Sequence, residues 1–218
     1  MAIKTQGTIV YMETALAAAK TITGASLGSP GAGAVTITSS THGYTNGDVI
    51  KITGVGGMQQ INNRAFIVAS SVTNSFVLKG TNASAYTAYT SGGSAFKATM
   101  SAVGEVRDIP EMGGTEPNEF DVSHLLSIAE EKLAGLPRQA SVSFNVWFDL
   151  TTAMHSTLLN ANEDLVDRVF HFYRPSSFNM TLVAQVAGVR VTAGDVNSAY
   201  AATVTLTPRA AGAWSLTT

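Results

Sequence analysis

The stretch QASVSFNVWFDL, residues 139–150, alternates apolar and polar side chains with the clearest period of two in the chain. One face carries Ala140, Val142, Phe144, Val146, Phe148 and Leu150, and the other carries Ser141, Ser143, Asn145 and Asp149. This pattern is typical of a β-strand that lies on a hydrophobic core and turns its other face to solvent. Trp147 interrupts the polar face, so either a second surface covers the sheet there or its own loops shield the ring.

Further segments of strand composition predict that most of the fold is built in the same way. They span residues 7–12, 102–109, 168–174, 178–192 and 198–209. Residues 151–164, TTAMHSTLLNANED, have a clear helical spacing, and their apolar positions include Met154, Leu158 and Ala161. We therefore expect a mostly β protein, with a β-sandwich or barrel-like domain and one flanking α-helix.

Two runs of small residues, at 23–34 and 90–95, have the composition of flexible connectors. Between them, residues 35–96 contain short runs rich in Val, Ile, Phe and Thr that are separated by turn signals. This pattern predicts a small all-β domain inserted into a larger one. The larger domain is then discontinuous, with residues 1–22 and 98–218 folding together.

The composition restricts the possible partners and compartments. Charged residues make up 13% of the chain, about half the usual share, which predicts that part of the surface faces other protein. A net charge of −2 and a pI near 6.1 argue against a general basic surface for nucleic acid. Cysteine is absent, which excludes disulfides and thiolate chemistry. Without a signal-peptide core or an apolar run of about 18 residues, we expect a soluble protein made in the cytoplasm.

No catalytic or ligand-binding motif stands out. The segment GVGG at 54–57 lies between expected strands, so a hairpin or bulge explains it better than a phosphate-binding loop, which precedes a helix. The histidines, His42, His124, His155 and His171, have no ligand-like spacing, and no GxSxG nucleophile motif occurs. We therefore expect no enzyme activity, no catalytic residues, no cofactor and no metal site.

Residues 121–139, DVSHLLSIAEEKLAGLPRQ, differ from this β pattern because several apolar side chains recur at helical spacing. They are Leu125, Leu126, Ile128, Ala129 and Leu133. Ser127 with Glu130 resembles a capping box, and the turn at 135–137 ends the run, so a short amphipathic helix is expected. A helix this short needs a surface to lie on. That surface is either the chain's own sandwich or, because a long loop at 110–120 precedes the segment, another molecule.

Acidic residues are concentrated between residues 105 and 131, where eight of them accompany one basic residue, Arg107. A solvated loop explains such a run without any function. Alternatively, acids that line a channel would keep a polyanion from binding its wall, because each phosphate contact with a basic wall would retain it. Glu105, Asp108 and Glu111 are the candidates for a negative lining of this kind.

Three features, in order along the chain, carry a resemblance to a known family. GTIVYMET occurs near the N-terminus, VGEVRDIPEMGGTEPNEFDVSHLLSIAEEKLAGLPRQASVSFNVWFD follows at 103–149, and a short helix with three strands closes the chain. These parts, residues 1–21 and about 98–218, resemble the major tail tube protein of long, non-contractile-tailed bacteriophages. Residues 35–96 resemble a small β module of phage structural proteins that is distantly similar to a domain of ubiquitin-activating enzymes. No ubiquitin chemistry is implied, since the chain has no cysteine.

The resemblance implies a structural virion protein without a reaction or cofactor. Copies of the chain would form hexameric rings whose inner sheets join into a barrel, and the rings would stack into the tail tube through which DNA is ejected. In this family an arm after the early strands reaches the neighbouring ring. Here that arm maps onto Phe120, Val122, Leu125, Leu126, Ile128, Leu133 and Leu136.

The resemblance also implies partners and a location. The partners are further copies of the chain, the tape measure protein, the tail terminator and the distal tail protein, with DNA passing through the lumen without specific binding and with no membrane. The location is the virion tail, assembled in the host cytoplasm. The inserted domain would decorate the outside of the tube.

Two other functions fit the same β-rich sequence. An adhesin-like or carbohydrate-binding β protein would use the inserted domain as its reader, with Tyr86 and Tyr89 stacking on sugar, although tyrosines in such a segment are more often packing residues. A tube protein of a bacterial secretion system is the second alternative, since the fold alone does not separate it from a phage tube.

Overall fold

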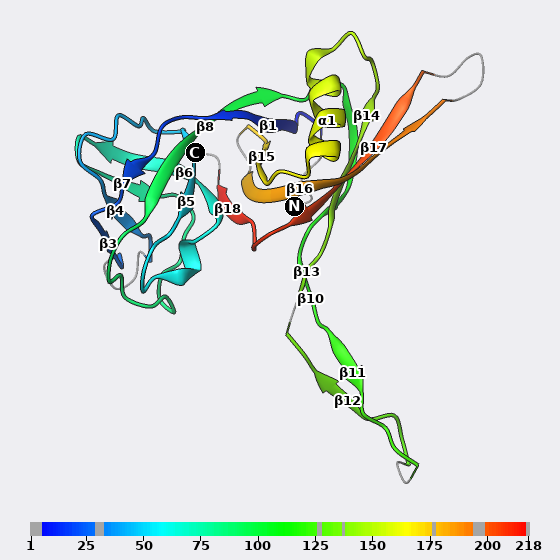
Figure 1. The fold of residues 1–218 in the computed structure, drawn as a ribbon, viewed down its shortest axis with the longest axis horizontal. Helices are drawn as coiled ribbons and strands as arrows, with labels where there is room; N and C mark the ends of the chain where they lie inside the picture. Colours follow the sequence, from blue (N-terminus) through cyan, green and yellow to red (C-terminus); the bar gives the residue numbers. More distant parts are fainter. Residues whose placement is uncertain are drawn as a thin grey trace.

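The structure is a computed structural model that describes residues 6–28, 33–125, 128–136, 138–175, 178–193 and 199–216 (Figure 1). Within these residues the protein is mostly β-strand, with a single α-helix, α1 (Ala153–Asp164), and one 3₁₀ turn, Gln59–Ile61. The predicted mostly β class is confirmed, and so is the predicted helix. In the described part of the chain, no helix has the length and apolar composition needed to cross a membrane.

Fourteen of the described strands form one continuous sheet, in the order β3-β4-β7-β6-β5-β8-β1-β15-β16-β17-β14-β9, with β18 beside β16 and β2 beside β8. These strands are β1 (Ile9–Leu16), β2 (Lys20–Thr21), β3 (Gly24–Ser26), β4 (Thr36–Thr38), β5 (Val49–Thr53), β6 (Arg64–Val72), β7 (Ser75–Leu78), β8 (Ser94–Ala102), β9 (Val106–Met112), β14 (Val142–Trp147), β15 (Arg168–Tyr173), β16 (Phe178–Thr192), β17 (Ala201–Pro208) and β18 (Ala213–Leu216).

Four further strands form two separate two-stranded ladders, β10 with β13 and β11 with β12. They are β10 (Thr115–Glu116), β11 (Glu119–Asp121), β12 (Lys132–Ala134) and β13 (Arg138–Gln139). Figure 1 shows these strands in a long arm that leaves the body between β9 and β14.

The strand β16 bends so that its two halves belong to two layers. Its first half, up to Ala184, pairs with β15 and β18, whereas the half that continues to Thr192 pairs with β17. The layers β1-β15-β16 and β16-β17-β14-β9 enclose the main core. Phe144 of β14 meets Phe172 of β15 there, edge to face, with 6.2 Å between ring centroids. Leu158 of α1 joins this core, so the sandwich has one flanking helix.

The predicted alternation of residues 139–150 is found in β14, where the apolar side chains at 142, 144 and 146 are fully buried. The predicted strand at 102–109 is wrong as a single unit. The chain turns at Gly104 and Glu105, whose φ angles are 76° and 47°, so β8 ends before this turn and β9 begins after it. The strand predicted at 178–192 is confirmed with the same ends as β16, and the remaining predicted strands are present with shifted ends.

A second core lies in the lobe, which we define as residues 20–96. Strands β3 to β8 surround it, and its largest fully buried side chains are Ile22, Ile37, Ile50, Ile52, Met58, Ile61, Phe66 and Phe76. Residues 24–26 form β3 and pair with β4, and residues 94–95 begin β8. Parts of both predicted flexible connectors are therefore strands of the sheet.

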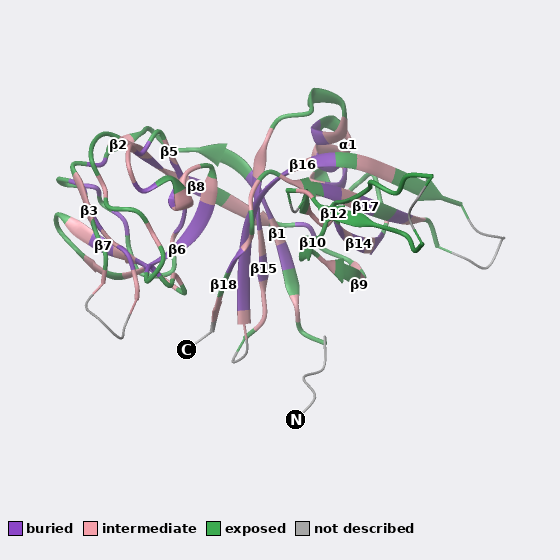
Figure 2. Cartoon of the chain, turned by 90° about the horizontal axis from the view of Figure 1, so that it is seen from below, coloured by how far each residue is buried: buried purple, intermediate pink, exposed green. Residues whose placement is uncertain are grey.

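A shared strand and a third buried cluster join the lobe to the sandwich. β8 pairs with β5 at its N-terminal end and with β1 at its C-terminal end, and Figure 2 shows it running between the two parts. In the cluster, Val49 and Ala65 of the lobe pack with Val169 and Val183 of the sandwich. The Thr181 hydroxyl also donates a hydrogen bond to the Ala65 carbonyl at 2.7 Å. The junction is therefore formed by paired strands and buried side chains, and the prediction of flexible connectors is wrong for the strand residues within them.

Candidate assembly surfaces

The segment predicted as an amphipathic helix is a β-hairpin, so the helix prediction is wrong. In this arm, defined as residues 115–139, pairing of β11 with β12 sets Phe120 opposite Leu133. Nearer the body, Arg138 of β13 forms an ion pair with Glu116 of β10 at 2.8 Å. Apolar and oppositely charged side chains that face each other across two strands stabilise a ladder.

Gly135 has a role other than the predicted helix stop. The ring of Phe120 lies across its backbone, and a β-carbon at Gly135 would collide with that ring. The Gly135 N–H also donates to the Asn118 carbonyl at 2.6 Å. Only glycine allows an aromatic ring to approach the backbone of the partner strand so closely. The glycine that suggested the end of a helix therefore packs the hairpin.

The apolar side chains of the arm are exposed. The six predicted arm residues that the structure describes are at least 47% exposed, and they are Phe120, Val122, Leu125, Ile128, Leu133 and Leu136. Leu125 and Ile128, near the tip, are fully exposed. Leu126, the seventh, lies outside the described residues. A two-stranded ladder has no second layer of its own, and the exposure of these side chains shows that the described part of the sandwich does not cover them.

The layer β16-β17-β14-β9, which we call the wall sheet, has an open edge at each side within the described residues. β9 ends the order of the sheet, and β16 beyond Ala184 pairs on one side only, with β17. Such edges present N–H and C=O groups that can pair with another chain. All neighbours in the wall sheet are antiparallel, so its two edge strands run in opposite directions. The edge strand β9 is thus oriented to pair antiparallel with β16 of a second copy that is related to the first by a rotation.

The face of the wall sheet that points away from the main core is polar. Its side chains include Ser143, Asn145, Thr203 and Thr205, with Asp108 and Glu111 opposite β14 in the register. Thr203 donates to Asn145 at 2.6 Å and Asn145 donates to Asp108, which links three strands. The structure thus brings two predicted lining acids, Asp108 and Glu111, onto one face. The third, Glu105, is exposed in the turn before β9.

Trp147 is covered by an arginine of the neighbouring strand. The Arg107 guanidinium lies 5.1 Å from the centre of the Trp147 ring, and it also pairs with Asp108 at 3.1 Å. The ring remains 40% exposed. A cation over the face of an indole is a favourable contact, so neither a second surface nor the loops are needed to explain this position.

Glu13 is buried where β1 bulges against β8. Its Oε2 accepts a hydrogen bond from the Val169 N–H at 2.9 Å. Burial raises the pKa of this carboxyl above its ordinary 4.5, although the hydrogen bond and the positive charges of Lys51 and Arg168 oppose that shift. The stability of the sandwich is therefore expected to depend on pH through Glu13, which lies far from the arm in sequence.

The four histidines do not form a site together. His42 is buried in the lobe, His155 is buried on α1, His171 lies on β15, and His124 is exposed on the arm. No group of three or more metal-ligating side chains occurs among the residues that the structure describes.

The tyrosines proposed as sugar contacts have packing roles. Tyr86 and Tyr89 lie against the lobe core, and the Tyr89 hydroxyl donates to a main-chain carbonyl of the lobe at 3.3 Å. A different pair, Tyr11 and Tyr173, borders a cleft at the junction of lobe and sandwich. The sequence signal for this pair was the alternation in RVFHFYR, residues 168–174, where His171 and Tyr173 alternate with the core residues Phe170 and Phe172.

Comparisons with known proteins give one match to part of the sequence and structural similarities with low TM-scores. A profile of the ubiquitin-activating enzyme E1 FCCH domain matches residues 31–98, less than half of the chain. No curated protein matches the sequence. The tail of an empty GTA particle, with C6 symmetry, is similar with a TM-score of 0.39 and 19% identity over 55% of this chain and 87% of that chain. The six-fold symmetrised baseplate of the anti-feeding prophage is similar with a TM-score of 0.36 and 8% identity, over 80% of this chain and 96% of that chain. TM-scores this low establish neither family nor assembly.

Proposed function

We propose that this protein is a structural subunit that pairs edge to edge into a ring, and that stacked rings form a tube of the bacteriophage-tail type. One observation carries the proposal: among the described residues, the antiparallel wall sheet has four strands and an unpaired edge at both sides. Pairing β9 of each copy with β16 of the next would make a continuous barrel, which leaves no exposed edge. Head-to-tail pairing of this kind closes when the rotation between copies divides a full turn, and the sequence resemblance suggests six copies.

The polar face of the wall sheet would then line the tube, because the main core and α1 occupy the other face. Asp108 and Glu111 would balance the arginines at 107 and 190, and Glu105 would add a further negative charge. A wall without excess positive charge does not retain DNA. The proposed role is therefore that of a conduit for DNA ejection, in which the protein catalyses no reaction.

The arm would connect successive rings. Its tip residues, Leu125 and Ile128, are not covered by any other residue that the structure describes, and we propose a further copy as their partner. Obligate interfaces commonly bury more than about 2,000 Å², and a chain with only 13% charged residues can supply such surfaces. The tape measure protein inside the tube, and the terminator and distal tail proteins at its ends, are further proposed partners that rest on the sequence resemblance.

The lobe would be an insertion carried on the outside of the tube. The sequence assigned residues 1–22 and 98–218 to the tube domain and residues 35–96 to the inserted domain. The lobe begins earlier, at residue 20, because Ile22 lies in its core. Two observations support the proposed insertion: the lobe has a core of its own, and it packs on the β1-β15 layer rather than on the polar face of the wall sheet.

Cysteine cross-linking across the two edges tests the ring. The chain has no cysteine, so Asp108→Cys on β9 and a second cysteine placed in turn at positions 187–192 of β16 introduce the only thiols. A short bis-maleimide applied to assembled protein should give, for at least one position, a ladder of covalent oligomers that stops at the ring number. Denaturing electrophoresis reads the ladder.

The matched control combines Val72→Cys, an exposed position of the lobe, with the same β16 cysteines, and it should give no ladder. Protein that forms tubes in negative-stain electron microscopy but gives no ladder at any position would contradict the edge pairing. A chain that stays monomeric at every concentration, also with tail partners present, would contradict the proposed function itself.

A further inference from the structure

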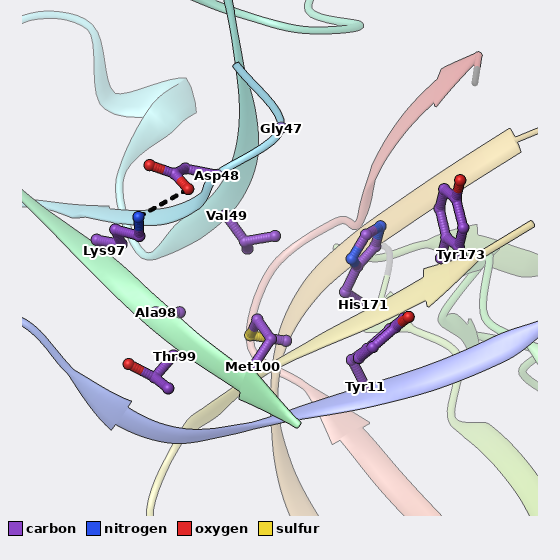
Figure 3. A pocket seen from close by; sticks show the side chains of 10 residues that line it. All are labelled: Tyr11, Gly47, Asp48, Val49, Lys97, Ala98, Thr99, Met100, His171 and Tyr173. Carbon is purple, nitrogen blue, oxygen red and sulfur yellow. Dashed lines mark ion pairs between the residues drawn. The ribbon is translucent and has the colours of Figure 1, made fainter. Parts of the chain in front are cut away.

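A cleft of about 440 Å³ lies where the lobe meets the sandwich, on the face of β1 and β15 that points away from the main core. Its lining includes Tyr11, His171 and Tyr173 of the sandwich together with Asp48, Lys97 and Met100 (Figure 3). A second cleft of about 400 Å³ shares Gly47, His171 and Tyr173 with the first, so both open onto the same aromatic wall.

The three rings of this wall form a row across two strands. Tyr11 and His171 are partners in the β1–β15 register and stack with 5.7 Å between ring centroids. The His171 and Tyr173 rings are 5.8 Å apart, and Figure 3 shows the three rings side by side. The buried cluster that joins lobe and sandwich covers this face farther along, around Val169. The lobe thus covers one part of the face and leaves the aromatic row accessible.

The polar atoms of the row are not all used within the chain. Neither the Tyr11 nor the Tyr173 hydroxyl has a hydrogen-bond partner among the described residues. The Nε2 atom of His171 lies 3.0 Å from Oδ1 of Asn179. In the neutral tautomer that donates from Nε2 to this amide oxygen, Nδ1 is an acceptor. Burial also lowers the pKa of His171, which favours the neutral ring. The wall therefore offers two hydroxyls and one acceptor beside aromatic carbon.

The charges around the first cleft are matched. The Lys97 Nζ atom lies 2.8 Å from Oδ1 of Asp48, and the other Asp48 oxygen accepts a hydrogen bond from the Thr45 N–H at 2.9 Å. Lys79 borders the second cleft and has interactions of its own. A charged ligand would find no unmatched opposite charge in the first cleft, and binding it there would cost the desolvation of that charge. The electrostatics therefore favour a neutral ligand.

We propose that this junction cleft binds a neutral saccharide. The sugar hydroxyls would exchange hydrogen bonds with Tyr11, Tyr173 and Nδ1 of His171, and an apolar sugar face would lie against the aromatic wall. Sites for small ligands combine a largely apolar lining with a few polar groups that fix orientation, and tyrosine supplies both in one side chain. The cleft uses neither the arm nor the open edges, so this inference is independent of the proposed function.

Saturation-transfer-difference NMR with maltoheptaose, cellohexaose, chitohexaose and yeast mannan as probes tests the site, since the method works for assembled and unassembled protein alike. Wild-type protein should transfer saturation to at least one probe. Replacing both hydroxyls, Tyr11→Phe with Tyr173→Phe, keeps the rings and should weaken binding about 3- to 10-fold. Tyr173→Ala, which also removes a ring, should weaken binding further.

Tyr86→Phe is the matched control, because this tyrosine packs on the lobe core away from the cleft, and it should bind as wild type does. Circular dichroism checks that each variant folds. If Tyr173→Ala does not fold, the double phenylalanine variant still tests the site. The proposal is overturned if no neutral probe binds, if the double variant binds as wild type does, or if anionic hyaluronate binds more tightly than every neutral probe. Binding that is lost on assembly would also overturn it, because another copy would then fill the cleft.

Discussion

The lobe and the arm both interrupt the sandwich, yet they treat apolar residues in opposite ways. The lobe buries Phe66, Phe76 and Ile50 completely in its own core, whereas the arm leaves Leu125 and Ile128 fully exposed. The difference lies in the number of strands. Six strands in the order β3-β4-β7-β6-β5-β8 can close around an apolar interior, whereas a two-stranded ladder has no second layer.

This contrast shows what an apolar segment does and does not predict. A run of Leu, Ile and Phe indicates that a surface will be removed from water, because the hydrophobic effect is proportional to apolar area. It does not indicate which molecule supplies the cover. For the lobe the cover is intramolecular, and for the arm our proposal assigns it to a second copy.

The largest expected effect separates the two regions directly. Phe76→Ala should destabilise the protein by about 3–5 kcal/mol, because it removes a fully buried ring from the lobe core and leaves a cavity. The matched arm variant, Phe120→Ala, should change the free energy of unfolding by at most about 1 kcal/mol, because the ring is half exposed and contacts the partner strand of the ladder. Urea unfolding measures both. Equal losses in the two variants would break the contrast between lobe and arm.

A smaller loss is expected at the junction. Val183→Ala should cost about 2 kcal/mol, because the side chain is buried between lobe and sandwich. The loss should appear as a shift of one cooperative transition, since the shared core couples both parts. Val191→Ala, at a 44% exposed position of the same strand, is the control and should have little effect. Two separate transitions, only one of which moves, would show that the lobe unfolds independently.

The pH dependence of stability should come from Glu13 in the sandwich and not from the arm. Glu13 has a folded-state pKa above its unfolded value of about 4.5, so the folded protein binds this proton more tightly. The contribution of Glu13 to stability is then fully present below the unfolded pKa and is lost as the pH rises through the folded pKa. Glu13→Gln keeps an acceptor for the Val169 N–H and should flatten this decline.

Urea midpoints measured from about pH 4 to 8 would reveal the difference between wild type and Glu13→Gln. Glu111→Gln, at an exposed position of β9, should leave the wild-type profile unchanged. An identical decline in wild type and Glu13→Gln would rule out this carboxyl as its source.

The smallest effect on stability is expected where the effect on assembly is largest. Replacing the tip residues together, Leu125→Asp with Ile128→Asp, should change the free energy of unfolding by less than about 0.5 kcal/mol, because both side chains are already in water. The variant should form no tubes in negative-stain electron microscopy. Val72→Asp, on the exposed surface of the lobe, should still assemble. Long tubes from the tip variant would remove the arm from the inter-ring contact.

Local patterns allowed the sequence to predict part of this fold. The burial at positions 142, 144 and 146 follows from a period of two within a single strand, and α1 follows from helical spacing within fourteen residues of sequence. Neither element depends on a distant partner for its identity. Most strands were predicted for the same reason, although several begin or end at other residues than predicted.

Features that depend on pairing across the chain could not be predicted. The arm is a hairpin because Phe120 faces Leu133 and lies over Gly135, whereas the leucine spacing of the intervening residues suggested a helix. The open edge of β16 exists because its register with β15 stops at Ala184. The cleft likewise depends on the β1–β15 register, which places Tyr11 beside His171.

The path of β8 has a mechanical consequence. Because one strand is hydrogen-bonded to the lobe at its beginning and to β1 at its end, a force that pulls the lobe along this strand enters the sandwich through the β8 backbone. The hydrogen bonds to β1 then share the load in shear instead of opening one at a time. A ligand bound to the lobe is thus connected to the sandwich through a hydrogen-bonded strand.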